Sequence, residues 1–202
     1  MKRMAAIAFA VALVFACRNQ SETTSATNTT ETVNTTGTET TGTTSTTSTG
    51  SSGGTVASLS TGDKEFIAKA AQGGMSEVQM GQMAASKGTT NDARDFANRM
   101  VVDHGKANDE LKQLATTKGL ALPAEPAADQ KKTANDLSKK SAMPFDRAYI
   151  TEMVKDHEKD VAEFEKASKD AQDPDLKSWV TKTLPTLQDH LRMAKQIAAK
   201  LK

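Results

Sequence analysis

Three histidines and one glutamate are the residues of this sequence that are best suited to chemistry. His104, His157 and His190 are the only histidines in the 202-residue chain, and each directly follows an aspartate. Each also lies three, four or seven residues from apolar positions, which puts it on the apolar face of an expected helix. Glu77 lies on the corresponding face of the first expected helix. The spacing therefore directs three imidazoles and one carboxylate toward the same interior.

The four residues also lie at similar depths in their helices. Each is about thirteen to sixteen residues from the start of its expected helix, at about 1.5 Å of rise per residue. In a bundle of antiparallel helices, equal depths give similar heights. The sequence therefore predicts that the four side chains form one layer in the middle of a bundle.

Such a layer has two interpretations, because polar groups are costly to bury without partners. The first is a single transition-metal ion, copper, zinc or iron, held by Glu77, His104, His157 and His190, since neutral imidazole and carboxylate are ligands for these metals. The second is a structural network in which the histidines hydrogen-bond Glu77, Asp160 and Tyr149. The sequence leaves both open.

Residues near the layer add to the metal interpretation. Asp160, three residues after His157, is expected to orient that imidazole from outside the ligand shell. Met100 and Met153 each lie four residues before a histidine, and thioethers beside imidazoles suit copper(I). Methionine also fills irregular cores, which is the alternative role for both. The aspartate before each histidine is turned about 100° around the helix, toward solvent or a neighbouring helix.

No enzyme signature is present in the sequence. The Glu-x-x-His motif of di-iron bundles is missing, because Val101, Val154 and Leu187 stand three residues before the histidines. The chain also lacks Gly-x-Ser-x-Gly, His-Glu-x-x-His and phosphate-binding glycine motifs. We therefore expect no enzymatic activity, and keep redox or hydrolytic chemistry on the histidine layer as a weaker alternative.

Helical periodicity covers the chain from Asp63 to its end, without any alternating strand pattern. Long helices are predicted over about 63–87, 91–118, 144–172 and 174–201, with a short helix over 127–140. Gly88, Gly119 and Pro174 mark helix ends. The Gly73–Gly74 pair costs its helix about 2 kcal/mol relative to alanine and should mark a close helix contact or a kink. The predicted fold is an all-α, antiparallel four-helix bundle over 61–202.

The N-terminal part has a different character. A basic start and an apolar run before Cys17 predict a signal peptide over 1–16, with Cys17 as a lipidated residue that anchors the protein to a membrane. Residues 17–60 are rich in Ser and Thr, a composition that predicts a disordered linker. The chain has 26 basic and 25 acidic residues and 4% aromatic residues, so nucleic-acid binding is not expected. Protein partners are not indicated.

Three stretches carry a resemblance to a known family. MSEVQMGQMAASKGTTNDARDFANRMVVDHGKANDELKQLA resembles the opening helices of a bacterial family of exported ferritin-like proteins of unknown function. FDRAYITEMVKDHEKDVAEFEKAS and LPTLQDHLRMAKQI resemble its later helices. The resemblance implies a ferritin-like four-helix bundle.

The N-terminal residues also resemble those of Gram-negative lipoproteins, with Arg18 after the cysteine, which implies an outer-membrane location facing the periplasm. The sequence thus predicts a membrane-tethered envelope protein that acts as a non-enzymatic binding or stress-related module. The alternative is a metal-binding protein that uses the His/Glu layer.

Overall fold

The computed structural model describes residues 58–202, which form five helices and no strand. The helices are α1 (Thr61–Lys87), α2 (Asn91–Thr117), α3 (Ala128–Ser138), α4 (Ala142–Asp170) and α5 (Pro174–Lys200). The all-α prediction, with a short extra helix in the long connection, is confirmed. The predicted signal peptide, lipidated Cys17 and nearly all of the linker lie outside the described residues. Within the described part, no helix is long and apolar enough to cross a membrane.

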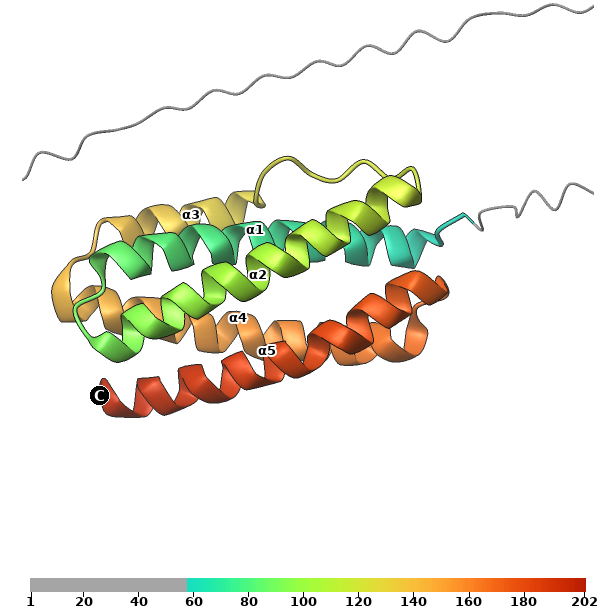
Figure 1. Cartoon of the computed structure of the whole chain (residues 1–202). Helices are drawn as coiled ribbons and strands as arrows, with labels where there is room; N and C mark the ends of the chain where they lie inside the picture. The colour runs from blue at the N-terminus through green and yellow to red at the C-terminus, as the bar shows by residue number, and fades with distance from the viewer. Residues whose placement is uncertain (1–57) are drawn as a thin grey trace, which may run out of the picture. The chain divides into compact units, whose positions relative to one another are not determined.

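The four long helices form an antiparallel bundle (Figure 1). Around the bundle, α1 packs on α2, α2 on α5, α5 on α4, and α4 on α1. Because α2 and α4 run in the same direction, the connection between them returns along the length of the bundle. Its helix α3 packs against α1 and α4, so the connection covers one side of the bundle instead of capping one end.

Helix ends follow the sequence signals closely. The Thr90 side chain caps α2 by accepting from Ala93 N at 3.3 Å, and Asp173 caps α5 ahead of Pro174. Gly119, with φ 66°, ends α2 in a Schellman motif, with Leu120 N donating to Ala115 O at 2.8 Å. These capping residues fix where each helix starts or stops, and so the height of the residues within it.

Gly88 departs from its expected role. The sequence suggested a left-handed C′ glycine, but Gly88 has φ −57°. Its small size matters for another reason, because a Cβ there would lie 2.7 Å from the carbonyl oxygen of Ala84. The following turn is held by the buried carboxylate of Asp146 in α4, which accepts from the backbone nitrogens of Thr89 and Thr90 at 3.0 and 2.8 Å.

Glycines of α1 let it approach α2 closely. A Cβ on Gly74 would lie 2.0 Å from Asn108 Oδ1, and a Cβ on Gly81 would lie 3.0 Å from Val101 Cγ2. The predicted close contact is confirmed at Gly74. Gly73 has no such contact, since the nearest atom to its Cβ position is Gln130 Nε2 at 3.9 Å.

The apolar core is split into two clusters by the histidine layer. On each long helix, the buried residues on one side of the layer belong to one cluster and those on the other side to the second. The first cluster contains Met80, Ala84, Phe96, Ala97, Met100, Ala134, Leu137, Phe145, Tyr149, Ile150, Met153, Ala194, Ile197 and Leu201. The second contains Leu59, Ile67, Ala71, Leu111, Ala115, Phe164, Ala167, Leu176, Trp179, Val180 and Leu187. A band of polar side chains thus crosses the middle of an otherwise apolar interior.

Candidate metal centre

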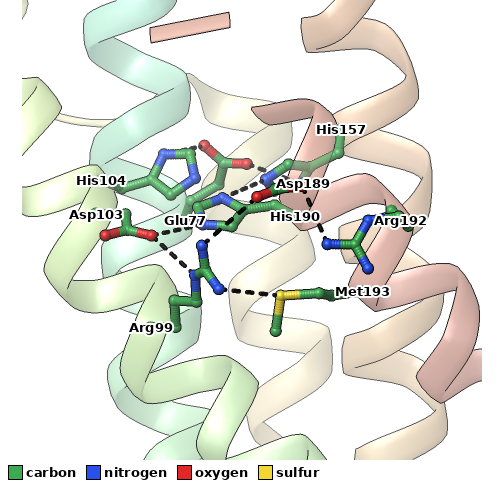
Figure 2. A network of polar contacts seen from close by, with 9 residues as sticks. All are labelled: Glu77, Arg99, Asp103, His104, His157, Asp189, His190, Arg192 and Met193. Carbon is green, nitrogen blue, oxygen red and sulfur yellow. Dashed lines mark hydrogen bonds and ion pairs between the residues drawn. The ribbon is translucent and has the colours of Figure 1, made fainter. Parts of the chain in front are cut away.

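The three histidines meet at the centre of the bundle, as their spacing predicts (Figure 2). His157 and His190 are fully buried, and His104 is 5% exposed. Their ring centroids lie 5.2–5.4 Å from one another. One nitrogen of each ring lies within 4.8 Å of the corresponding nitrogens of the other two, which is close enough for all three to bind one ion.

Each imidazole is held by an acceptor on its outer side. His104 Nδ1 lies 3.0 Å from Glu77 Oε2. His157 Nδ1 lies 2.9 Å from the carbonyl oxygen of Met153, one turn earlier in α4. His190 Nε2 lies 2.9 Å from Asp103 Oδ2. Acceptors of this kind orient histidine ligands around metals and fix which nitrogen carries the hydrogen.

The outer contacts determine the state of the inner nitrogens. A neutral imidazole has one N–H. When Glu77 is ionised, that hydrogen is directed outward in all three rings, and His104 Nε2, His157 Nε2 and His190 Nδ1 face inward as lone pairs. His157 Nε2 and His190 Nδ1 are 3.4 Å apart, and His104 Nε2 has no hydrogen-bond partner among the described residues. Three acceptors therefore converge on one point without a donor.

Burial keeps these rings neutral. Desolvation lowers the pKa of His104, His157 and His190 to about 4 in each case. Glu77 opposes the shift at His157, and Asp103 opposes it at His104 and His190, but both effects are smaller than desolvation. At neutral pH no added proton sits between the inner nitrogens, so protonation does not relieve the contact of the three lone pairs.

Glu77 and Asp160 form a carboxyl pair next to the layer. Burial raises the pKa of Glu77 to about 7 and that of Asp160 to about 9, and the charge of Glu77 adds to the shift at Asp160. Asp160 therefore keeps its proton at neutral pH, and its protonated carboxyl group lowers the pKa of Glu77. The sequence pointed to Asp160 as the residue that orients His157. In the structure the carbonyl of Met153 takes that position, and Asp160 acts on Glu77.

Glu77 itself lies outside the set of three inner nitrogens. The sequence placed it among the ligands, whereas its carboxylate faces the outer nitrogens of His104 and, at 3.4 Å, His157 (Figure 2). A glutamate side chain on this helix face can reach either the inner or the outer nitrogen of an imidazole ring. Helical spacing alone does not distinguish these two positions.

Tyr149, Met100 and Met153 are all buried in the first apolar cluster. The hydroxyl of Tyr149 has no hydrogen-bond partner among the described residues, so it does not join the network as the second interpretation required. Burial raises the pKa of Tyr149 above its usual value. Met80 lies one turn from Glu77 on α1, so three buried methionines adjoin the layer on the same side. Whether they contribute ligands stays a prediction.

The packing of α2 on α5 brings two further polar residues, Asp103 and Arg99, to the histidines. Asp103, expected to face solvent or another helix, contacts His190 on α5. Arg99, one turn earlier, lies with Nε 3.2 Å from the same oxygen of Asp103, and also contacts Asp189 and Met193 on α5. Burial alone would raise the pKa of Asp103, but hydrogen bonds from His190 and Arg99 outweigh it and keep the pKa below its usual value. The i,i+4 spacing of Arg99 and Asp103 was the only sequence signal.

Two cavities reach the site from different sides. A cavity of about 280 Å³ extends between α1, α3 and α4 and has Glu77 and His104 at its inner end. A smaller cavity of about 120 Å³ lies between α2 and α5 and is lined by Asp103, His104 and His190. The layer is buried, yet each cavity brings open space to at least one of its histidines.

Residues 48–197 match the family model of DUF4142, a domain of unknown function. The chain belongs to this family. A search of curated proteins gives no match.

Several solved structures share the fold of this DUF4142 protein. A DUF305 fragment from Deinococcus radiodurans superposes with a TM-score of 0.63 at 13% identity, over 71% of this chain and 99% of that one. CopM in its Cu(I)-bound form gives a TM-score of 0.58 at 16% identity, over 68% and 96%. CopM in its Cu(II)-bound form gives 0.60 at 17%, over 69% and 97%. At these identities the similarity establishes a common helical bundle.

Proposed function

We propose that this DUF4142 domain binds one transition-metal ion through His104, His157 and His190, and that the ion is copper. The observation that carries the proposal is the convergence of three inward-facing lone pairs, each fixed by an acceptor on the far side of its ring. A cation at the centre gives all three nitrogens a partner.

The competing interpretation is a structural hydrogen-bond network. Such a network alternates donors with acceptors, and it would need at least one N–H among the inner nitrogens. In all three rings the single N–H hydrogen is used in the contact on the outer side, when Glu77 is ionised. A purely structural role would have to supply the missing hydrogens from water in the adjoining cavities or from a protonated Glu77. Without them, each unpaired buried acceptor is unfavourable by about 1–3 kcal/mol.

The spacing of the nitrogens suits a first-row metal. Two nitrogens bound at about 2.0–2.1 Å, in tetrahedral or trigonal geometry, lie about 3.3–3.6 Å apart. His157 Nε2 and His190 Nδ1 already lie at 3.4 Å. His104 lies within the 4.8 Å limit and has the partner-free nitrogen, so a small rotation of this ring completes the site.

Copper is favoured over zinc and iron by the surroundings. The inner donors are three neutral nitrogens, without the carboxylate that iron sites in bundles use. Buried thioethers of Met80, Met100 and Met153 lie within one helical turn of the layer, and soft ligands select copper(I). CopM, which shares the fold, has been solved with Cu(I) and with Cu(II).

The biological role that fits is a non-enzymatic metal-holding module in the cell envelope. The sequence supports export and tethering through Cys17, and a DUF305 protein of similar fold from Streptomyces coelicolor is described as secreted. A buried site would limit the contact of bound copper with other molecules. Anchoring by a lipid at the outer membrane is part of the proposal.

The test uses the chain from Arg18 onward, purified without metal. Cu(I), Cu(II) and Zn(II) are titrated against a competing chelator, and the melting temperature is measured with each ion. Binding to the folded state raises the melting temperature in proportion to RT ln(1 + [L]/Kd). We expect one Cu per chain and a clear rise. Tighter binding of Zn(II) than of copper would correct the metal, and the absence of any binding would refute the site.

Replacing all three histidines by leucine provides the matched control. Leucine fills a similar volume without polar atoms, so the variant should fold and lose metal binding completely. A second variant, His157→Gln, removes one nitrogen from the centre and should weaken binding while keeping the fold. Unchanged binding in either variant would place the metal elsewhere.

A further inference from the structure

The larger cavity links solvent to the histidine layer. Its outer part is lined by the exposed side chains of Lys69, Asp129 and Lys159, and its inner end by buried Glu77 and His104. The volume is about 280 Å³, which is room for several water molecules. Polar side chains therefore line the cavity both at its mouth, on the surface of α3 and α4, and at its inner end, beside one of the three proposed ligands.

The double glycine of α1 lies along this cavity, and its two members differ. Gly74 has a packing reason, because a Cβ there would collide with Asn108 of α2. Gly73 has none, since its Cβ position is 3.9 Å from the nearest atom and points toward Gln130 of α3. Glycine in a helix interior is less stable than alanine, and no packing contact offsets this cost at Gly73.

We propose that the larger cavity is the route by which the metal ion reaches the histidines, and that Gly73 keeps this route open. The inference rests on the proposed function, because it concerns the same site. Any side chain at Gly73 would project into the cavity between α1 and α3, in the path between the exposed mouth and Glu77. The absence of a side chain leaves a passage for an incoming hydrated cation.

The chemistry of the walls fits a cation that loses water on the way. Asn108 offers an amide oxygen along the passage, whereas Gln130 uses its oxygen to accept from Ala127 N and turns its amide nitrogen toward Gly73. The carboxyl groups of Asp160 and Glu163 also line the cavity. Oxygen donors of this kind can replace water around an ion in transit. His104, at the end of the cavity, carries the inner nitrogen without a partner and is the first imidazole that the ion meets.

The smaller cavity is a poorer entrance. Lys182 Nζ and Glu110 Oε1 form an ion pair of 2.7 Å that joins α5 to α2 beside it. Its acidic residue nearest the site, Asp103, is already paired with Arg99 and His190. Lys106 adds one positive charge to its walls. The larger cavity also has two lysines, Lys69 and Lys159, but it has four carboxyl groups beside them, from Glu77, Asp129, Asp160 and Glu163, and is therefore the better entrance for a cation.

The experiment compares rates of metal uptake in the chain from Arg18 onward. Trp179 is the only tryptophan, and it lines the larger cavity. Quenching of its fluorescence by Cu(II) therefore reports arrival of the ion in stopped-flow mixing. Gly73→Leu narrows the passage, Gly73→Met does so with a more flexible side chain, and Gly73→Ala leaves most of it open. Thr186→Leu narrows the smaller cavity instead.

We expect Gly73→Leu and Gly73→Met to slow association by about tenfold or more, with an equilibrium dissociation constant within about twofold of the parent. Gly73→Ala and Thr186→Leu should bind at the parent rate, and Gly73→Ala should melt at a higher temperature. Parent-like association in both larger Gly73 variants would overturn the route and leave the metal site standing. Slowing in Thr186→Leu alone would assign entry to the other cavity. Failure of the parent chain to bind copper would overturn both proposals.

Discussion

Nε2 of His190 lies 2.9 Å from Oδ2 of Asp103, so a carboxylate of α2 fixes the hydrogen position of an imidazole on α5. The same oxygen accepts from Arg99 Nε at 3.2 Å (Figure 2). The ionised aspartate holds the ring with Nδ1 directed inward, toward His157. One face of the centre is thus positioned by a charged pair that lies partly at the surface.

This arrangement predicts that Asp103→Asn weakens copper binding without removing a ligand. An amide oxygen accepts a weaker hydrogen bond than a carboxylate, and its NH₂ group can favour the wrong ring hydrogen. The expected loss of affinity is about 10–100-fold, the range for outer partners of metal-bound histidine. Competition titration with Cu(I) measures it.

Arg99→Gln should produce a smaller loss, since Arg99 acts through Asp103. Arg192→Gln is the matched control, because Arg192 pairs with Asp189 at 3.0 Å and has no contact with Asp103. If Arg192→Gln and Arg99→Gln weakened binding equally, the effect would be one of general surface charge and not of ring positioning.

The position of the histidine layer could be predicted from the sequence because local signals fix the helix ends. Thr90, Gly119 and Asp173 cap helices through their own side chains or backbone conformation, so the depth of each histidine follows by counting. The face of each residue follows from the helical period. Both kinds of information are local, and both were right.

The partners of each ring could not be predicted in this way. Asp103 reaches His190 only because the long connection returns along the bundle and places α2 beside α5. His157 is oriented by a backbone carbonyl, which leaves no trace in residue types. The role of Glu77 depends on the rotation of the His104 ring, and that depends on side-chain packing between α1 and α2. Tertiary neighbours and rotamers decide these contacts.

The three histidines alone should leave metal binding nearly independent of pH between 7 and 5, and a decrease over this range would report protonation of Glu77, whose pKa is about 7. A solvent-exposed histidine site weakens below pH 6.5 as protons compete for its nitrogens. Here burial holds the pKa of all three histidines at about 4, so protons begin to compete only as the pH approaches that value. Cu(II) titrations at pH 7, 6 and 5 in the presence of a fixed competing ligand measure the dependence.

The metal-free protein, in contrast, should lose stability as the pH falls over the same range. In the unfolded chain the histidines take up protons near pH 6.5, whereas in the folded chain they stay neutral down to about pH 4. Acidification therefore favours unfolding across this window, by up to about 1.4 kcal/mol per histidine and pH unit. The variant with three leucines should lack this part of the acid sensitivity. Equal pH profiles for the two proteins would contradict the burial of neutral rings.

Asp160→Asn should raise the stability of the protein at alkaline pH. Burial and the charge of Glu77 raise the pKa of Asp160 from 3.8 to about 9, so the folded state holds a proton that the unfolded state has lost. Stability from this group is full below the unfolded pKa and falls as the pH rises toward 9. Asparagine keeps an N–H donor near Glu77 and does not ionise at alkaline pH.

The difference in unfolding free energy between Asp160→Asn and the parent should therefore grow in favour of the variant from pH 5 to pH 8.5. Urea unfolding at both pH values measures it. Asp109→Asn, at an exposed position of α2, controls for net charge. A constant difference across the pH range would show that Asp160 is ionised in the folded protein.

Gly73→Ala and Gly74→Ala should change stability in opposite directions, although the residues are adjacent. Alanine at Gly73 meets no atom closer than 3.9 Å, so it gains helix propensity and should stabilise by about 1 kcal/mol. Alanine at Gly74 would place its Cβ 2.0 Å from Asn108 Oδ1, and the resulting overpacking should destabilise by about 1–3 kcal/mol.

A double variant separates the collision from other effects at Gly74. Asn108→Ala removes the side chain that a Cβ on Gly74 would strike, so Gly74→Ala should be much less destabilising in the Asn108→Ala background than alone. Thermal unfolding of the two single variants and the double variant gives the interaction energy. Additive changes would mean that α1 can shift away from α2 at this point, and the close contact between the two helices would not explain the glycine.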